Sequence, residues 1–143
     1  MEDALIILKP DALQKYLVPE ILTMLSPQVQ SFSHIRTVIP SIELIQLHYA
    51  HLSERTLKRN VAFLTSGPIL VLEVKTSIGA LRKLIGATDP SKADIGTIRQ
   101  RFSTDSIQLA EQENRGLHNL IHCSDTSTNG LAEIATWRKY FPQ

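Results

Sequence analysis

In the segment Asn119-Leu120-Ile121-His122-Cys123-Ser124-Asp125, apolar alternation coincides with a group of reactive side chains, as it does nowhere else in the chain. The alternation predicts a strand. In a strand Leu120 and His122 point to the same face, so we expect the imidazole to be half buried. For a lone histidine the ordinary interpretation is a core residue whose hydrogen bonds are satisfied.

His122 is not alone, however, because other reactive groups lie close to it in the sequence. Ser124 and Asp125 follow it directly, and Glu133 follows eleven residues later in an expected helix. A carboxylate or hydroxyl can fix the tautomer of an imidazole and leave its other nitrogen free as a nucleophile. The segment therefore predicts a candidate nucleophile as well as a strand.

Composition limits the class of protein. Of 143 residues, 43% are hydrophobic and 20% charged, as in one globular domain with a proper core. The net charge of +1 gives no reason to expect nucleic acid or an anionic membrane as a partner. Cys123 is the only cysteine, so we expect no internal disulfide. The apolar run 4–8 is far below the ~20 residues of a membrane span, and no basic-then-apolar leader precedes it. We expect a cytoplasmic protein.

Apolar periodicity predicts most of the remaining elements. We expect strands at 4–8, 32–39 and 69–74, and helices at 19–25, 41–52, 56–65, 77–85 and 129–140. Ser41 is the expected cap of one helix and Gly86 the expected end of another, while Leu131, Ile134 and Trp137 are expected to face inward. Residues 87–116 show no period, so we expect a long, functional connection with at most one helical turn.

This order of elements predicts a single antiparallel or mixed sheet that helices cover on one face. A split βαβ arrangement brings the first and last strands near the centre, where Lys9 and His122 become neighbours. Lys9, Arg82, Arg99 and Arg101 together can neutralise a polyphosphate, although each alone is more often a solvated charge. Glycine-rich phosphate loops and zinc-ligand spacings are missing from the sequence, and His34, His48, His51 and His118 receive no role.

Six motifs, in order and almost end to end, resemble those of nucleoside diphosphate kinases. They are Leu8-Lys9-Pro10-Asp11-Ala12, Leu47-His48-Tyr49, Thr65-Ser66-Gly67-Pro68, residues 82–90 (Arg-Lys-Leu-Ile-Gly-Ala-Thr-Asp-Pro), Gly96-Thr97-Ile98-Arg99 and Asn119-Leu120-Ile121-His122-Cys123-Ser124-Asp125. The last motif, Asn-x-x-His-x-Ser-Asp, is highly specific. The resemblance covers residues 4–140.

The resemblance implies an α/β (α+β) fold, a ferredoxin-like sandwich whose four-stranded antiparallel sheet is covered by helices, as one domain over residues 1–143. It implies that nucleoside triphosphates and diphosphates are the substrates, with Mg²⁺ bound through the nucleotide phosphates rather than by protein ligands. The implied reaction is a ping-pong phosphoryl transfer through a phosphohistidine at His122. A homo-oligomer is also implied, and neither a membrane nor a specific nucleic acid is expected as a partner.

The resemblance also implies roles for residues at matching positions. Glu133 would orient the His122 imidazole with support from Ser124, while Lys9 and Tyr49 would lie at the transferred phosphoryl group. The implied nucleotide-binding residues are Lys9, Tyr49, Thr56, Leu57, Arg82, Thr88, Arg99 and Asn119. A loose phosphoryl transition state needs positioned positive charge, which two arginines and a lysine supply.

The chain departs from the family pattern at Gln100 and Cys123, which removes no catalytic group, and in two further places. Residues 103–115 form an apparent insertion before the active strand, which resembles a subgroup of the family. Thr56 and Leu57 stand near the position where the family usually places an aromatic ring against the base. These departures keep a second hypothesis open, a catalytically weak relative that binds nucleotide or acts as a scaffold.

Overall fold

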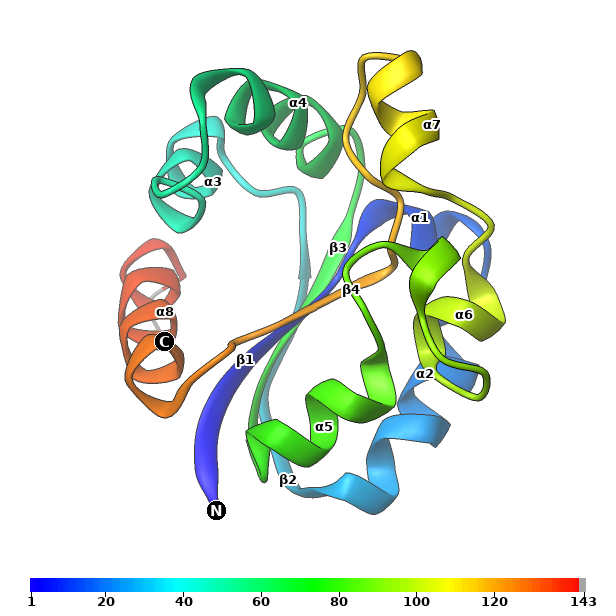
Figure 1. Ribbon diagram of the computed structural model, residues 1–143. Helices are drawn as coiled ribbons and strands as arrows, with labels where there is room; N and C mark the ends of the chain where they lie inside the picture. Colours follow the sequence, from blue (N-terminus) through cyan, green and yellow to red (C-terminus); the bar gives the residue numbers. More distant parts are fainter. Residues whose placement is uncertain (142–143) are drawn as a thin grey trace.

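A four-stranded antiparallel sheet in the order β2-β3-β1-β4 forms the centre of the computed structural model, which describes residues 1–141 (Figure 1). Its strands are β1 (Glu2–Leu8), β2 (Val29–Val38), β3 (Ile69–Thr76) and β4 (Ile121–Cys123). This confirms the expected four-stranded antiparallel sheet. Because β1 pairs with β4, Ile7 lies opposite His122, and Lys9 follows directly at the end of β1.

Helices cover both faces of the sheet, so the prediction of one covered face was wrong. In β1 the side chains of Ala4, Ile6 and Leu8 join one core cluster, whereas Leu5 and Ile7 join the other. The first cluster packs against α1 (Pro10–Gln14), α2 (Val18–Leu25), α5 (Ile78–Ile85) and α6 (Ile98–Phe102). The second packs against α3 (Ile42–His48), α4 (Glu54–Leu64) and α8 (Ser127–Tyr140). A continuous apolar run such as β1 is typical of a strand buried on both faces.

Two expected helix ends are confirmed by their local chemistry. The Ser41 hydroxyl accepts a hydrogen bond from the Leu44 amide at 3.1 Å and so caps α3. Gly86 ends α5 at a φ of +98°, and a Cβ on it would lie 2.6 Å from the Thr97 hydroxyl oxygen. Glycine is required there both by the backbone conformation and by the close approach of Thr97.

The prediction of a long irregular connection at 87–116 was wrong. The segment contains the 3₁₀ helix η2 (Pro90–Lys92), α6 and α7 (Ile107–Gln112). Thr97 and Ser106 cap α6 and α7 through their hydroxyls, which accept from the Gln100 and Leu109 amides. These helices are too short to show an apolar period, so their caps were the only local signal.

The turn before β4 alters which side chains share a face. Leu120 has a φ of +75°, which breaks the strand alternation, and β4 begins only at Ile121. Leu120 therefore packs in the same core cluster as Ile121, and the prediction that it shares a face with His122 was wrong. His122 is nevertheless mostly buried, with 17% of its side chain exposed. In α8, Ile134 and Trp137 face inward as expected, but Leu131 is 56% exposed.

No helix within residues 1–141 combines the length and the apolar character needed to cross a membrane.

Candidate active site

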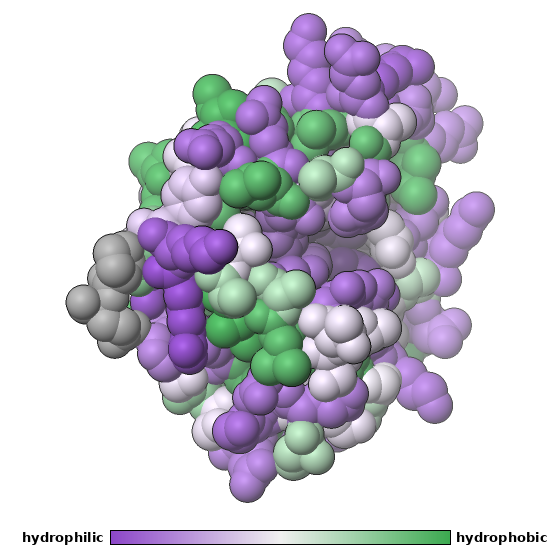
Figure 2. Space-filling view, turned by 90° about the vertical axis from the view of Figure 1, so that its left-hand side faces the viewer, coloured by the Kyte–Doolittle hydropathy of each residue, from purple (hydrophilic) through white to green (hydrophobic). Residues whose placement is uncertain are grey.

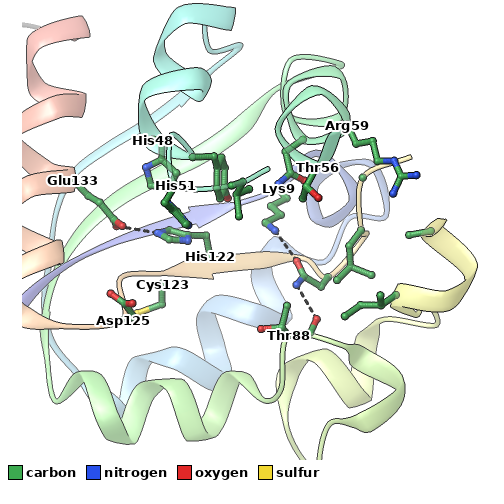
Figure 3. Close-up of a pocket in the computed structure, with 18 of the residues that line it drawn as sticks. Lys9, His48, His51, Thr56, Arg59, Thr88, His122, Cys123, Asp125 and Glu133 are labelled. Carbon is green, nitrogen blue, oxygen red and sulfur yellow. Dashed lines mark hydrogen bonds and ion pairs between the residues drawn. The ribbon is translucent and has the colours of Figure 1, made fainter. Parts of the chain in front are cut away.

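A cleft of about 830 Å³ opens beside β4 and receives side chains from both helical layers. Figure 2, in which the left-hand side of Figure 1 faces the viewer, shows a hollow among hydrophilic residues. The expected site residues that line the cleft are Lys9, Tyr49, Thr56, Arg82, Thr88, Arg99, Asn119, His122 and Glu133. Figure 3 labels five of them, Lys9, Thr56, Thr88, His122 and Glu133. Leu57 is half-buried and lies outside the lining, and Ser124 is fully buried behind it.

His122, Glu133 and Ser124 form a hydrogen-bonded chain anchored on the backbone of β1. The Leu5 amide donates to the Ser124 hydroxyl at 2.9 Å, and this hydroxyl donates to Glu133 Oε1 at 2.7 Å. The same Glu133 oxygen lies 2.9 Å from His122 Nε2. When the carboxylate accepts from Nε2, the neutral ring carries its lone pair on Nδ1. The geometry therefore presents Nδ1 as a nucleophile.

The wall beside the His122 imidazole consists of neutral rings. The His48 and Tyr49 rings meet the imidazole edge to face, at centroid distances of 4.6 and 6.2 Å. His48 Nδ1 accepts a hydrogen bond from the Trp137 indole at 3.0 Å, and burial holds the His48 pKa well below its usual value. Burial also raises the Tyr49 pKa, so its phenol stays protonated and can donate. Sequence reasoning missed His48 because its partner, Trp137, is remote along the chain.

Three groups of this site have the atom types that bind metals. His48, His122 and Glu133 offer ligand atoms that all lie within 4.8 Å of one another. Trp137 already occupies one His48 nitrogen, and Glu133 already serves both His122 and Ser124. The set is therefore better suited to orient a nucleophile than to hold an ion.

Lys9 and Asn119 lie further along the cleft and are joined to each other. The Lys9 ammonium donates to Asn119 Oδ1 at 2.7 Å, and the Asn119 amide donates to the Thr88 carbonyl at 2.9 Å (Figure 3). Burial, and then the charge of Arg99, lowers the Lys9 pKa to about 8. The expectation that Lys9 and His122 are neighbours is confirmed, since Lys9 directly follows β1, His122 lies on the paired strand β4, and both side chains line one cleft.

Two arginines reach the cleft from the opposite helical layer. Arg99 donates to the carbonyls of Asn119, Ile121 and Gly86 at 3.1, 2.5 and 3.0 Å, and so supports the turn that leads into β4. Burial and the nearby Arg82 lower the Arg99 pKa to about 10, which leaves the guanidinium charged at neutral pH. Arg82 donates to the Cys123 carbonyl at 2.9 Å. Arg101 does not line the cleft.

The comparisons with known proteins agree on one family. The family model described as nucleoside diphosphate kinase matches residues 2–141. The nucleoside diphosphate kinase of Herpetosiphon aurantiacus is 42% identical over 94% of this chain and 86% of its own length. That of Synechococcus elongatus is 39% identical over 96% of this chain and 87% of its own.

Two solved structures share the fold. An NDP kinase from Pyrobaculum aerophilum has a TM-score of 0.85 and 29% identity, covering 95% of this chain and 94% of that one. A nucleoside-diphosphate kinase from Borrelia burgdorferi, a transition state mimic with bound vanadate and ADP, has a TM-score of 0.86 and 27% identity. That match covers 95% of this chain and 86% of the other, and both structures support a ferredoxin-like sandwich.

Proposed function

Since the chain belongs to the nucleoside diphosphate kinase family, we propose that it transfers the γ-phosphate of a nucleoside triphosphate to a nucleoside diphosphate through a phosphohistidine at His122. The observation that carries this proposal is the hydrogen-bonded chain from Ser124 through Glu133 to His122, which leaves Nδ1 available at the cleft. Mixing the protein with ATP and GDP tests it, because the proposal requires ADP and GTP to form together. Absence of GTP would overturn it.

Each of these groups has a proposed role in the transfer. The His122 Nδ1 lone pair attacks the γ-phosphorus, the bond to the bridging oxygen breaks, and its electron pair leaves on the nucleoside diphosphate. Lys9, Arg82 and Arg99 place positive charge around the oxygens of the transferring group. A β-phosphate oxygen of the acceptor diphosphate then attacks the same phosphorus, and the N–P bond breaks. Tyr49 and Asn119 donate hydrogen bonds from the cleft wall, to the phosphoryl group and the sugar.

We place Mg²⁺ on the nucleotide phosphates. The residues fit this arrangement, because the described cleft wall supplies Lys9, Arg82 and Arg99 for a polyphosphate. Of the carboxylates nearest to His122, Glu133 is engaged by His122 and Ser124, and Asp125 accepts from Asn129. Bound in this way, the ion neutralises phosphate charge and orients the leaving group. The nucleotide-binding group then consists of Lys9, Tyr49, Thr56, Arg82, Thr88, Arg99 and Asn119.

Replacing Glu133 by Gln is expected to slow phosphoryl transfer by about 10- to 1000-fold while the fold stays intact. Glu133 Oε1 accepts a hydrogen bond from the Ser124 hydroxyl and lies at hydrogen-bond distance from His122 Nε2. A neutral amide in place of this carboxylate stabilises the imidazole less when the other ring nitrogen of His122 becomes phosphorylated. Single-turnover formation of the phosphoenzyme measures the effect. An unchanged rate would remove Glu133 from the machinery.

Activity is expected to decline above about pH 8 as Lys9 loses its proton. The Lys9 pKa is lowered to about 8, so the ammonium is present below that pH and lost above it. A neutral amine no longer stabilises phosphate charge, and kcat/KM reports the pKa of the free enzyme. In Lys9→Arg the cation persists, so the alkaline decline should move to higher pH. A wild-type profile that stays flat to about pH 10 would contradict this role.

We propose that the chain assembles into a homo-oligomer. β2 is an edge strand, and two isoleucines are exposed there: Ile35 within the strand is 59% exposed, and Ile39, directly after its last residue, is 61% exposed. An exposed apolar edge can pair with a second copy of itself across a two-fold axis. Light scattering at micromolar concentration should give at least a dimer, and Ile35→Lys should weaken association about tenfold or more. A monomeric wild-type protein would contradict the proposal.

We also propose that residues 1–143 act as one domain in the cytoplasm. The family model spans nearly the whole chain, and Cys123, the only cysteine, is buried and free. The alternative of a weak nucleotide-binding scaffold is not favoured, because the proposed nucleophile and the charged groups around it all line one cleft. These groups are His122, Glu133, Lys9, Arg82 and Arg99.

A further inference from the structure

Beyond Lys9 and Asn119, the cleft continues between α4 and α7. Thr56 and Asn60 line this end from α4, and Ile107, Ala110 and Glu111 line it from α7. With the phosphates at His122 and the sugar at Lys9, as the proposed function requires, the base of a bound nucleotide falls between these two helices. The part of the base furthest from the sugar, its hydrogen-bonding edge, then lies nearest to them.

This end of the cleft differs from one in which an aromatic ring stacks on the base. The residues that line it from α4 and α7 include no aromatic side chain, and Phe63 of α4 stacks instead on His118, with ring centroids 4.4 Å apart. Ile107 and Leu117 supply apolar surface, which any base can cover equally well. Discrimination between bases must therefore come from a polar group.

Among the polar residues of α4 and α7 that line this end of the cleft, Glu111 is held in place by a hydrogen bond and is still open to the cleft. Its Oε1 accepts from Arg59 Nη1 at 2.7 Å, and Arg59 is itself buried and donates to Asn114 at 2.9 Å. Within residues 1–141, the charged group recorded near the other oxygen, Oε2, is the exposed Arg55 at 3.9 Å. The Glu111 side chain is 53% exposed, so Oε2 is available to a ligand while Oε1 fixes its position.

We propose that Glu111 selects bases that carry an amino group over bases that carry a carbonyl at the same ring position. A carboxylate only accepts hydrogen bonds. The amino groups of cytosine and adenine can donate to it, whereas the O4 of uracil and the O6 of hypoxanthine are acceptors that repel it. A bound base whose carbonyl faces the Glu111 carboxylate leaves both acceptors without a donor, which lowers the affinity for that nucleotide. This inference rests on the proposed function, because that function places the base at α7.

Size-matched acceptors test the proposal. The phosphoenzyme is prepared with labelled ATP, freed of nucleotide and mixed with CDP, UDP, ADP or IDP, and the second-order rate of label loss is measured. We expect CDP to exceed UDP, and ADP to exceed IDP, by about 5- to 50-fold. In Glu111→Gln both ratios should fall to within about twofold of one, since an amide can turn to donate to a carbonyl and can still accept from Arg59.

Glu113→Gln is the matched control. Glu113 is 50% exposed and accepts from Arg115 at 3.0 Å, much as Glu111 pairs with Arg59, but it does not line the cleft. Its substitution should leave both ratios unchanged. Equal rates with CDP and UDP in the unsubstituted enzyme, or equal effects of the two substitutions, would overturn the role of Glu111. Failure to form any phosphoenzyme is a different result, which would overturn the proposed function itself and this inference with it.

Discussion

Replacing His122 by Gln is expected to abolish the phosphoenzyme and to reduce transfer from ATP to a nucleoside diphosphate by about 10⁴-fold or more. A glutamine side chain can still hydrogen-bond to Glu133, so the packing beside α8 has no reason to change. What disappears is the ring nitrogen that must attack the phosphorus. Radiolabel retained on the protein and GTP formed from GDP are the two measurements.

His118→Ala provides the histidine control. His118 stacks on Phe63 and does not line the cleft, so its loss removes an aromatic contact worth about 0.5–1.5 kcal/mol but no reacting group. The phosphoenzyme should still form at close to the wild-type yield. If the two histidine variants lost activity equally, the assignment of the nucleophile to His122 would fail.

Replacing Arg99 by Met is expected to lower the free energy of unfolding by about 2–4 kcal/mol and to abolish detectable phosphoenzyme at low ATP. Arg99 is only 8% exposed, and its guanidinium donates to the carbonyls of Asn119 and Ile121 at the entrance to β4 and to the carbonyl of Gly86 at the end of α5. Methionine fills similar volume but leaves these carbonyls without donors. It also removes a positive charge from the phosphate end of the cleft.

Urea unfolding and ATP-dependent labelling measure these two effects separately. Arg101→Met is the control on the same helix, since Arg101 is exposed, lies over the Phe102 ring at 5.5 Å and does not line the cleft. It should change stability by less than about 0.5 kcal/mol and leave labelling intact. Similar unfolding curves for the two arginine variants would show that Arg99 does not hold the β4 turn.

The parts of the fold that sequence predicted are those with a strong local signal. The strand β1 and the end of α5 at Gly86 were both predicted correctly. A strand buried on two faces requires a continuous apolar run, and a positive φ favours glycine, so both features can be recognised in the sequence. α6 and α7 left only their capping residues, Thr97 and Ser106, since helices of five and six residues hold too few apolar positions to show a period.

The candidate site was predictable where its residues are close in the sequence, or where the expected split βαβ arrangement of strands brings them together. His122, Ser124 and Glu133 belong to one strand-to-helix unit, and Lys9 arrives by the pairing of β1 with β4. The left-handed turn at Leu120 was not predictable, because it depends on remote donors and acceptors. Asp11 accepts from the Leu120 amide at 3.1 Å, and the Lys9 amide donates to the Leu120 carbonyl at 2.8 Å.

In the proposed transfer His122 carries the phosphoryl group after the first nucleotide has left and before the second accepts it, and labelled ATP tests this most directly. Incubation with ATP labelled in its γ-phosphate is expected to give a phosphoprotein that is labile in acid and stable in base. Its label should map to the peptide that contains His122 and should move to CDP, yielding CTP. An unlabelled protein, or an acid-stable label on Ser124, would contradict the account.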